Sequence, residues 1–97
     1  FRMERLQEIR TRYQPIVEAE RNSVRMSKMV DFLFSRPILS IKQVAEGLDM
    51  PIKTASEYLS KLEKAGIVRE TTGFTRNRVY QADEILRIIQ TSEAPHG

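Results

Sequence analysis

The order of hydrophobic and polar positions along the chain predicts several short elements, and the clearest is a helix over residues 40–48. Its apolar residues are spaced as on one face of an α-helix: Ile41, Val44, Ala45 and Leu48. Ser40 lies just before this face, and Gln43 completes a capping box, in which each side chain bonds the backbone N–H of the other residue. We therefore expect a helix that begins at Ser40 and buries these apolar residues.

A second helix is predicted after a short interruption. The period breaks at residues 49–50, and the fixed φ of Pro51 suits the first position of a new helix. Gly66 is placed to end this helix, because glycine readily adopts the conformation of a C-terminal cap. The apolar, inward positions are Ala55, Leu59 and Leu62, and the charged, outward positions are Lys53, Glu57, Lys61 and Lys64.

A hairpin and a closing helix are expected next. Residues 67–72 and 77–82 are rich in β-branched side chains and tyrosine, and Gly73 lies in the connection between them. Asp83 is a plausible N-cap for a final helix, whose apolar positions are Ile85, Leu86 and Ile89.

The N-terminal third also has a helical period. Its first stripe contains Met3, Leu6, Ile9, Tyr13, Ile16 and Val17. Pro15 must either bend that helix or restart it. After a break at residues 20–23, a second stripe runs to Phe34 and ends before Pro37, because the residue before proline disfavours the α region. We expect Met26 and Met29 in this stripe to be core residues.

Together these elements predict a mainly α fold with a small β-hairpin, namely a winged helix-turn-helix preceded by an N-terminal helical arm. We expect the arm in residues 1–21, the winged domain in residues 22–91 and a disordered tail in residues 92–97. A chain of 97 residues with 40% apolar content can bury one core. The arm's stripe has no evident place in so small a domain, so we expect it to pack on a missing upstream domain or on a second copy of the chain.

Composition argues against catalysis and against bound cofactors. The chain has no cysteine, and its one histidine, His96, lies in a polar tail without coordination partners. The four glycines are scattered, so no phosphate-binding loop is expected. No apolar run approaches the ~20 residues that span a bilayer. We therefore expect no catalytic residue, metal, cofactor, small-molecule ligand or membrane contact, and a cytoplasmic location. Tyr58 and Tyr80 are expected to pack in the core.

Several segments carry a resemblance to a known family: Asp31-Phe32-Leu33-Phe34-Ser35-Arg36-Pro37, Val44-Ala45 with Leu48, Thr54-Ala55 with Leu59 and Leu62, Ala65-Gly66-Ile67-Val68, Thr72-Gly73 and Arg78-Val79-Tyr80. With them, residues 12–89 resemble the C-terminal winged-helix region of many Fic-family proteins. The resemblance implies a parent chain that transfers AMP or a related group to a protein hydroxyl, joined to this module through the arm. The family's signature, a histidine followed by Gly-Asn-Gly-Arg, does not occur here, so we do not expect this fragment to be an enzyme.

Winged-helix proteins that read DNA place the second helix of the turn motif in the major groove and the wing on the backbone. By that rule the candidate contacts are Lys53, Thr54, Ser56, Lys61 and Lys64 on the helix, with Arg76 and Arg78 on the hairpin. Two departures weaken the expectation. Winged regulators of similar sequence often have Ser or Thr in place of Pro51 and Arg in place of Glu57.

The charge distribution predicts local basic patches and no broad positive field. The formal net charge is +3. Residues 1–36 hold eight basic and five acidic side chains, whereas residues 37–97 hold eight of each. We therefore expect modest, salt-sensitive DNA binding by a module that autoregulates or targets its parent. The alternative is a protein-interaction or dimerisation module that has lost DNA binding and uses the arm as its interface.

Overall fold

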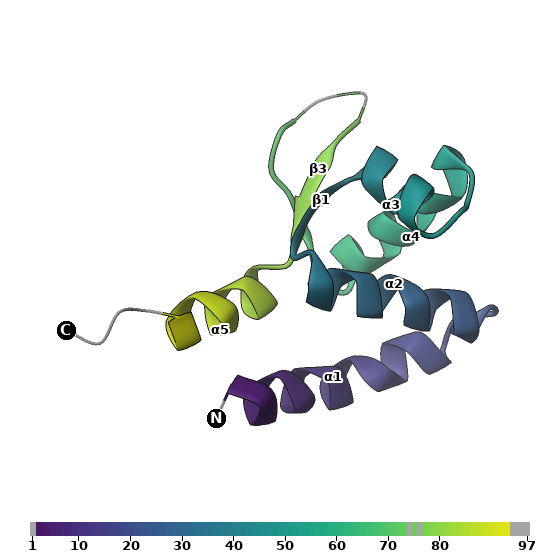
Figure 1. Cartoon of the computed structure of the whole chain (residues 1–97). Coiled ribbons are helices and arrows are strands. Elements are labelled where there is room, and N and C mark those ends of the chain that lie inside the picture. Colours follow the sequence, from purple (N-terminus) through teal and green to yellow (C-terminus); the bar gives the residue numbers. More distant parts are fainter. Residues whose placement is uncertain (1, 74, 76, 94–97) are drawn as a thin grey trace.

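Five helices and three strands make up the part of the chain that the computed structural model describes, which is residues 2–73, 75 and 77–93. In chain order they are α1 (Arg2–Glu18), α2 (Ser23–Ser35), β1 (Ile38–Ser40), α3 (Ile41–Gly47), α4 (Ile52–Lys64), β2 (Arg69–Glu70), β3 (Val79–Gln81) and α5 (Asp83–Glu93). The predicted class is confirmed, since the fold is mainly helical with a small antiparallel sheet (Figure 1). His96 and the rest of residues 94–97 lie outside the described residues.

The helix-turn-helix consists of α3 and α4, and local sequence signals set most of its boundaries. The capping box is confirmed: the Gln43 N–H donates to Ser40 Oγ over 3.1 Å, and the Ser40 N–H donates to Gln43 Oε1 over 2.9 Å. Gly66 follows α4 with φ +81°, as predicted for a C-terminal glycine. The position of Pro51 was predicted one residue too far into α4: Pro51 has extended ψ of 150° and is the N-cap, so Ile52 is the first helical residue.

The sheet is built around β3, which pairs with β1 on one side and β2 on the other, both antiparallel. Tyr80 lies opposite Leu39 in β1 and opposite Glu70 in β2. The sequence pattern did not predict β1. The hairpin was predicted, but its regular pairing is shorter than residues 67–72 and 77–82, because only residues 69–70 and 79–81 form strands.

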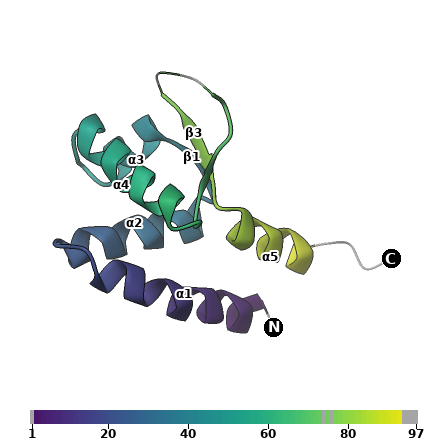
Figure 2. The same cartoon turned by 180° about the vertical axis from the view of Figure 1, so that it is seen from behind.

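The arm is α1, a single helix that runs through Pro15 without restarting. It lies alongside α2, and α5 returns to pack against it (Figure 2). Ile9, Tyr13 and Val17 are therefore buried in the same core as the winged domain. For these three side chains, the expectation that the stripe needs a missing domain or a second copy as its cover is wrong, because α2 and α5 supply the cover.

The remaining core agrees with the apolar pattern. Met26 and Met29 are fully buried on α2, and Tyr58 and Tyr80 are buried, as predicted. Asp83 is the first residue of α5 and not its N-cap, since the Ala82 carbonyl accepts from the Leu86 N–H over 2.9 Å. The helix continues to residue 93, two residues past the predicted end of the domain.

Candidate nucleic-acid interface

A hollow of about 740 Å³ lies between the start of α3, the first turns of α4 and the hairpin. We call it the α4–wing groove. Its lining consists of Ile41, Lys42, Ile52, Lys53, Ser56, Glu57, Thr75 and Asn77. In a winged helix-turn-helix, the second helix and the wing come together at this position, so a DNA contact is expected at this groove.

Hydrogen bonds from the first two N–H groups of α3 hold the wing against this helix. The Ile41 N–H donates to the Arg78 carbonyl over 3.0 Å, and the Lys42 N–H donates to Asn77 Oδ1 over 3.4 Å. Asn77 has φ +47°, a left-handed conformation that asparagine tolerates better than most residues. The wing is thus fixed to the first two residues of α3.

Two exposed lysines, Lys42 and Lys53, line this groove without an ion pair among the described residues. Ser56, one helical turn after Lys53, lies in the same lining with a half-buried side chain. Glu57 lies beside them and brings the one carboxylate of the lining. The groove therefore offers two cations and a hydroxyl group next to the first turns of α4.

The other predicted contacts are spread around this site. Lys64 is exposed in the last turn of α4, and Thr54 is half-buried outside the lining of the groove. Arg78 is exposed at the base of the wing. Arg76 lies outside the described residues. The structure thus brings Lys53 and Ser56 together with the wing and leaves Thr54, Lys61 and Lys64 elsewhere on α4.

Lys61 lies outside the lining of the groove and has an acidic partner. Its Nζ lies 2.7 Å from Glu20 Oε2, in the connection between α1 and α2. The hydrogen bond to Glu20 raises the pKa of Lys61. A lysine that already has a carboxylate partner contributes less binding free energy to a phosphate contact, because the existing ion pair must be broken first.

Arg69 also has a carboxylate partner. Its guanidinium donates to both carboxylate oxygens of Asp83, over 2.9 and 3.1 Å. This bidentate pair raises the pKa of Arg69 and lowers that of Asp83. Arg69 therefore ties β2 to the start of α5.

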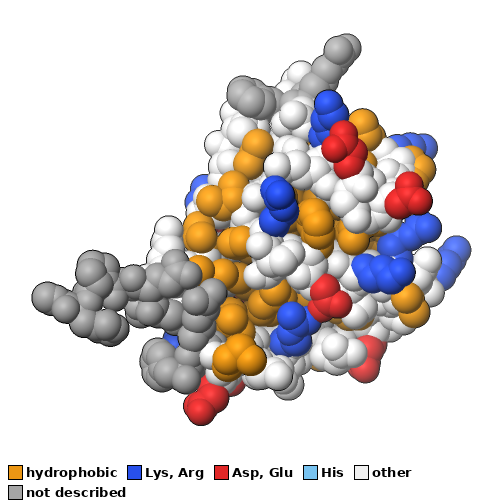
Figure 3. Space-filling view, in the orientation of Figure 1, with side chains coloured by type: hydrophobic (Ala, Val, Ile, Leu, Met, Phe, Trp, Pro, Cys, Tyr) orange, Lys and Arg blue, Asp and Glu red, His pale blue; other side chains and the backbone are white. Residues whose placement is uncertain are grey.

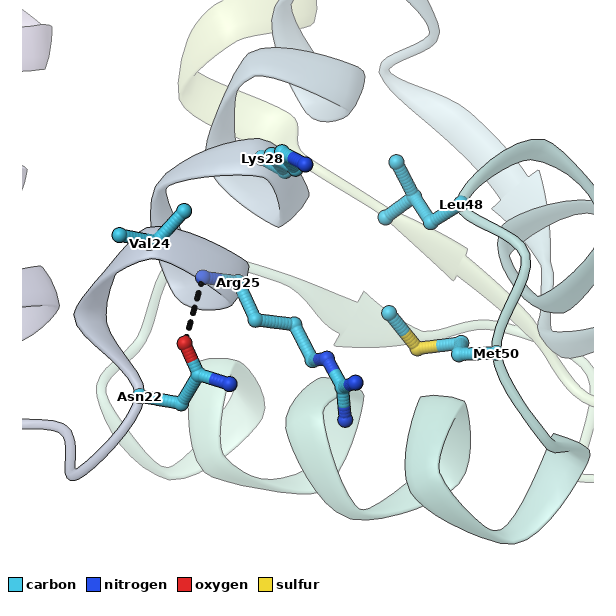
Figure 4. A pocket seen from close by; sticks show the side chains of 6 residues that line it. All are labelled: Asn22, Val24, Arg25, Lys28, Leu48 and Met50. Carbon is cyan, nitrogen blue, oxygen red and sulfur yellow. Dashed lines mark hydrogen bonds between the residues drawn. The ribbon is translucent and has the colours of Figure 1, made fainter.

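A smaller hollow, of about 230 Å³, lies between the start of α2 and the turn from α3 to α4 (Figure 4). Asn22 caps α2 there, since its Oδ1 accepts from the Arg25 N–H over 3.1 Å. The Arg25 side chain extends across the hollow, and Lys28 borders it. Neither this cap nor these two cations were predicted from the sequence, although Asn22 at the break before an apolar stripe is a usable N-cap signal.

The exposed face shown in Figure 3 carries several Lys and Arg side chains toward the side formed by α2, α3 and α4, with hydrophobic and acidic side chains between them. This agrees with local basic patches on an otherwise mixed surface. Within residues 2–73, 75 and 77–93, no group of three or more His, Cys, Asp or Glu side chains could hold a metal ion. No helix of the described structure is both long and apolar enough to cross a bilayer.

Comparison with known families supports the helix-turn-helix assignment. The model of the family described as "Bacterial regulatory protein, arsR family" matches residues 23–70. The match begins at the first residue of α2 and ends at the last residue of β2, so it contains both helices of the turn motif. No curated protein gives a significant match. Residues 23–70 are therefore similar to this family over a winged helix-turn-helix region, and the comparisons give no support to the Fic resemblance.

Proposed function

We propose that this module binds duplex DNA and regulates transcription, with the first turns of α4 in the major groove and the wing beside the backbone. The observation that carries the proposal is the α4–wing groove, where two exposed lysines, Lys42 and Lys53, stand without acidic partners among the described residues. The family match over residues 23–70 supports the same function. In this arrangement Lys53 and Ser56 face the bases or the adjacent phosphates, and Arg78 approaches the backbone from the wing.

The expected affinity is modest. Lysines and arginines that neutralise phosphates release counterions, and this release supplies most of the sequence-independent binding free energy. Here Lys61 and Arg69 are engaged with carboxylates, and Glu57 adds a negative charge to the groove. Binding should therefore weaken as the salt concentration rises, and the slope of log affinity against log salt is set by the few cations without a carboxylate partner.

Fluorescence anisotropy of a labelled duplex from the promoter of the native gene tests the proposal, at low and at near-physiological salt. A random duplex of equal length is the control for sequence preference. We expect tighter binding to the promoter duplex than to the random duplex. Lys53→Ala should bind more weakly, and its slope of log affinity against log salt should be lower by about 0.9. Arg87→Ala should bind with the affinity of the wild type, since Arg87 is exposed on α5. No binding at low salt by a folded protein would contradict the proposal and favour a protein-interaction module.

The identity of the parent chain is a separate part of the proposal. The resemblance to Fic-family winged regions predicts a histidine followed by Gly-Asn-Gly-Arg upstream of this module, with autoregulation or targeting of the parent as the role of the DNA contact. Sequencing the complete gene tests this directly. Absence of that signature would remove the Fic parentage and leave the DNA-binding proposal unchanged.

A further inference from the structure

An exposed isoleucine opens the second helix of the turn motif. Ile52 is the first residue of α4 and is 60% exposed, although it is one of the larger apolar side chains of the chain. It lines the α4–wing groove together with Ile41, which is only 7% exposed. Apolar surface thus continues from the core at Ile41 outward to Ile52 at the mouth of the groove.

The surroundings of Ile52 favour an anionic partner over an apolar one. Lys53 follows it directly and Lys42 lines the same groove, and neither has an ion pair among the described residues. A duplex satisfies both features, because its phosphates meet the lysines while its major groove presents one apolar group, the C5 methyl of thymine. The first residues of the second helix are those that reach base edges in this fold.

We infer that Ile52 is a specificity-determining residue that packs against the C5 methyl group of a thymine in the major groove. The inference rests on the proposed DNA-binding function and adds to it a preference for A·T pairs at the position under Ile52. Lys53 and Ser56 supply polar contacts on either side of that position. Burying one methyl group should strengthen binding by about fourfold.

The test compares two duplexes of equal length that differ only in this methyl group. One is an alternating A·T duplex, and the other is the same duplex with every thymine replaced by uracil. We expect the wild-type protein to bind the thymine duplex about fourfold more tightly in an anisotropy titration at low salt. Ile52→Ala should bind both duplexes equally, with the affinity that the wild type has for the uracil duplex.

Ile38→Ala is the matched control, since Ile38 is a 50% exposed isoleucine on β1, outside the lining of the groove. This variant should keep the full preference for thymine. Equal binding of both duplexes by the wild type would overturn the inference and leave the DNA-binding function in place. Failure of the wild type to bind either duplex would overturn the proposed function itself. An Ile52→Ala variant that keeps the preference would show that another residue contacts the methyl group.

Discussion

The Tyr13 hydroxyl donates a hydrogen bond of 3.1 Å to Glu84 Oε1, and so joins α1 to α5. The Arg12 guanidinium pairs with the other oxygen of the same carboxylate. Burial and the neighbouring Glu84 carboxylate raise the pKa of Tyr13 well above its usual range, so the hydroxyl stays protonated and able to donate. These contacts make α1 a structural part of the winged domain.

Replacing Tyr13 by phenylalanine should lower the free energy of unfolding by about 1 kcal/mol, because the ring still fills the core while one hydrogen bond is lost. Urea unfolding followed by circular dichroism measures this change. Tyr58→Phe is the control, since Tyr58 is also buried but its hydroxyl makes no hydrogen bond within the described structure. Equal losses in the two variants would show that the bond to Glu84 contributes nothing.

Asp83 should make stability depend on pH in the acid range. The bidentate contact with Arg69 lowers the pKa of Asp83 in the folded protein. The stabilisation is therefore present above the ordinary aspartate pKa of about 4. It is lost as the pH falls through the lower pKa that Asp83 has in the folded protein. We expect Asp83→Asn to be less stable than the wild type at neutral pH, and the difference to shrink toward pH ~3.

Urea unfolding at a series of pH values checks this prediction. Arg69→Gln should reproduce the effect, since it removes the other half of the pair. A difference in stability between wild type and Asp83→Asn that stays constant from neutral to acid pH would contradict it.

Gly47 packs directly against the aromatic ring of Phe32. A Cβ atom at this position would lie 2.7 Å from Cε1 and Cζ of Phe32, which is closer than van der Waals contact allows. We expect Gly47→Ala to lower the free energy of unfolding by about 1 kcal/mol, because the half-buried ring must move. In a Phe32→Ala background the same change should become neutral or stabilising, since alanine is then free to favour the helix. A double-mutant cycle measured by urea unfolding tests this, and additive effects would contradict it.

Lys61 and Lys53 should contribute unequally to DNA binding, although both lie on exposed positions of α4. Lys61 is held by Glu20, whereas Lys53 has no acidic partner among the described residues. Lys61→Ala should therefore change affinity and salt slope less than Lys53→Ala. Glu20→Gln should release Lys61 and steepen the salt slope, by up to about 0.9 for one added phosphate contact. Anisotropy titrations over a range of salt concentrations measure all three variants, and equal losses for the two lysine variants would contradict the prediction.

The features that the sequence predicted correctly depend on residues close together in the chain. The capping box needs only Ser40 and Gln43, and the left-handed position at Gly66 needs only the helix that precedes it. Burial of Met26 and Met29 follows from the period of a single helix. Each of these signals is complete within one or two helical turns, so no knowledge of the rest of the fold is required.

The features that were missed depend on contacts between distant segments. β1 is a strand only because it pairs with residues 79–81, and three residues carry too little pattern to reveal that partner. The cover over Ile9 and Tyr13 comes partly from α5, at the other end of the described chain. The ion pair between Lys61 and Glu20 joins residues that are 41 positions apart in the sequence. The sequence thus predicted which positions of α4 face outward. It did not predict which of the cations at these positions already have carboxylate partners.

The position of β3 between β1 and β2 has a consequence for how the protein is made. Both helices of the turn motif lie between β1 and β3 in the chain, and the Ala82 N–H closes this loop by donating to the Pro37 carbonyl over 2.7 Å. During synthesis, α3 and α4 leave the ribosome well before the strand that completes their sheet. Pairings between distant segments also form late in folding. We therefore expect a nascent chain that stops before residue 79 to contain all of α4 and still lack the strand that completes the sheet, so that the proposed DNA binding begins only when β3 is in place.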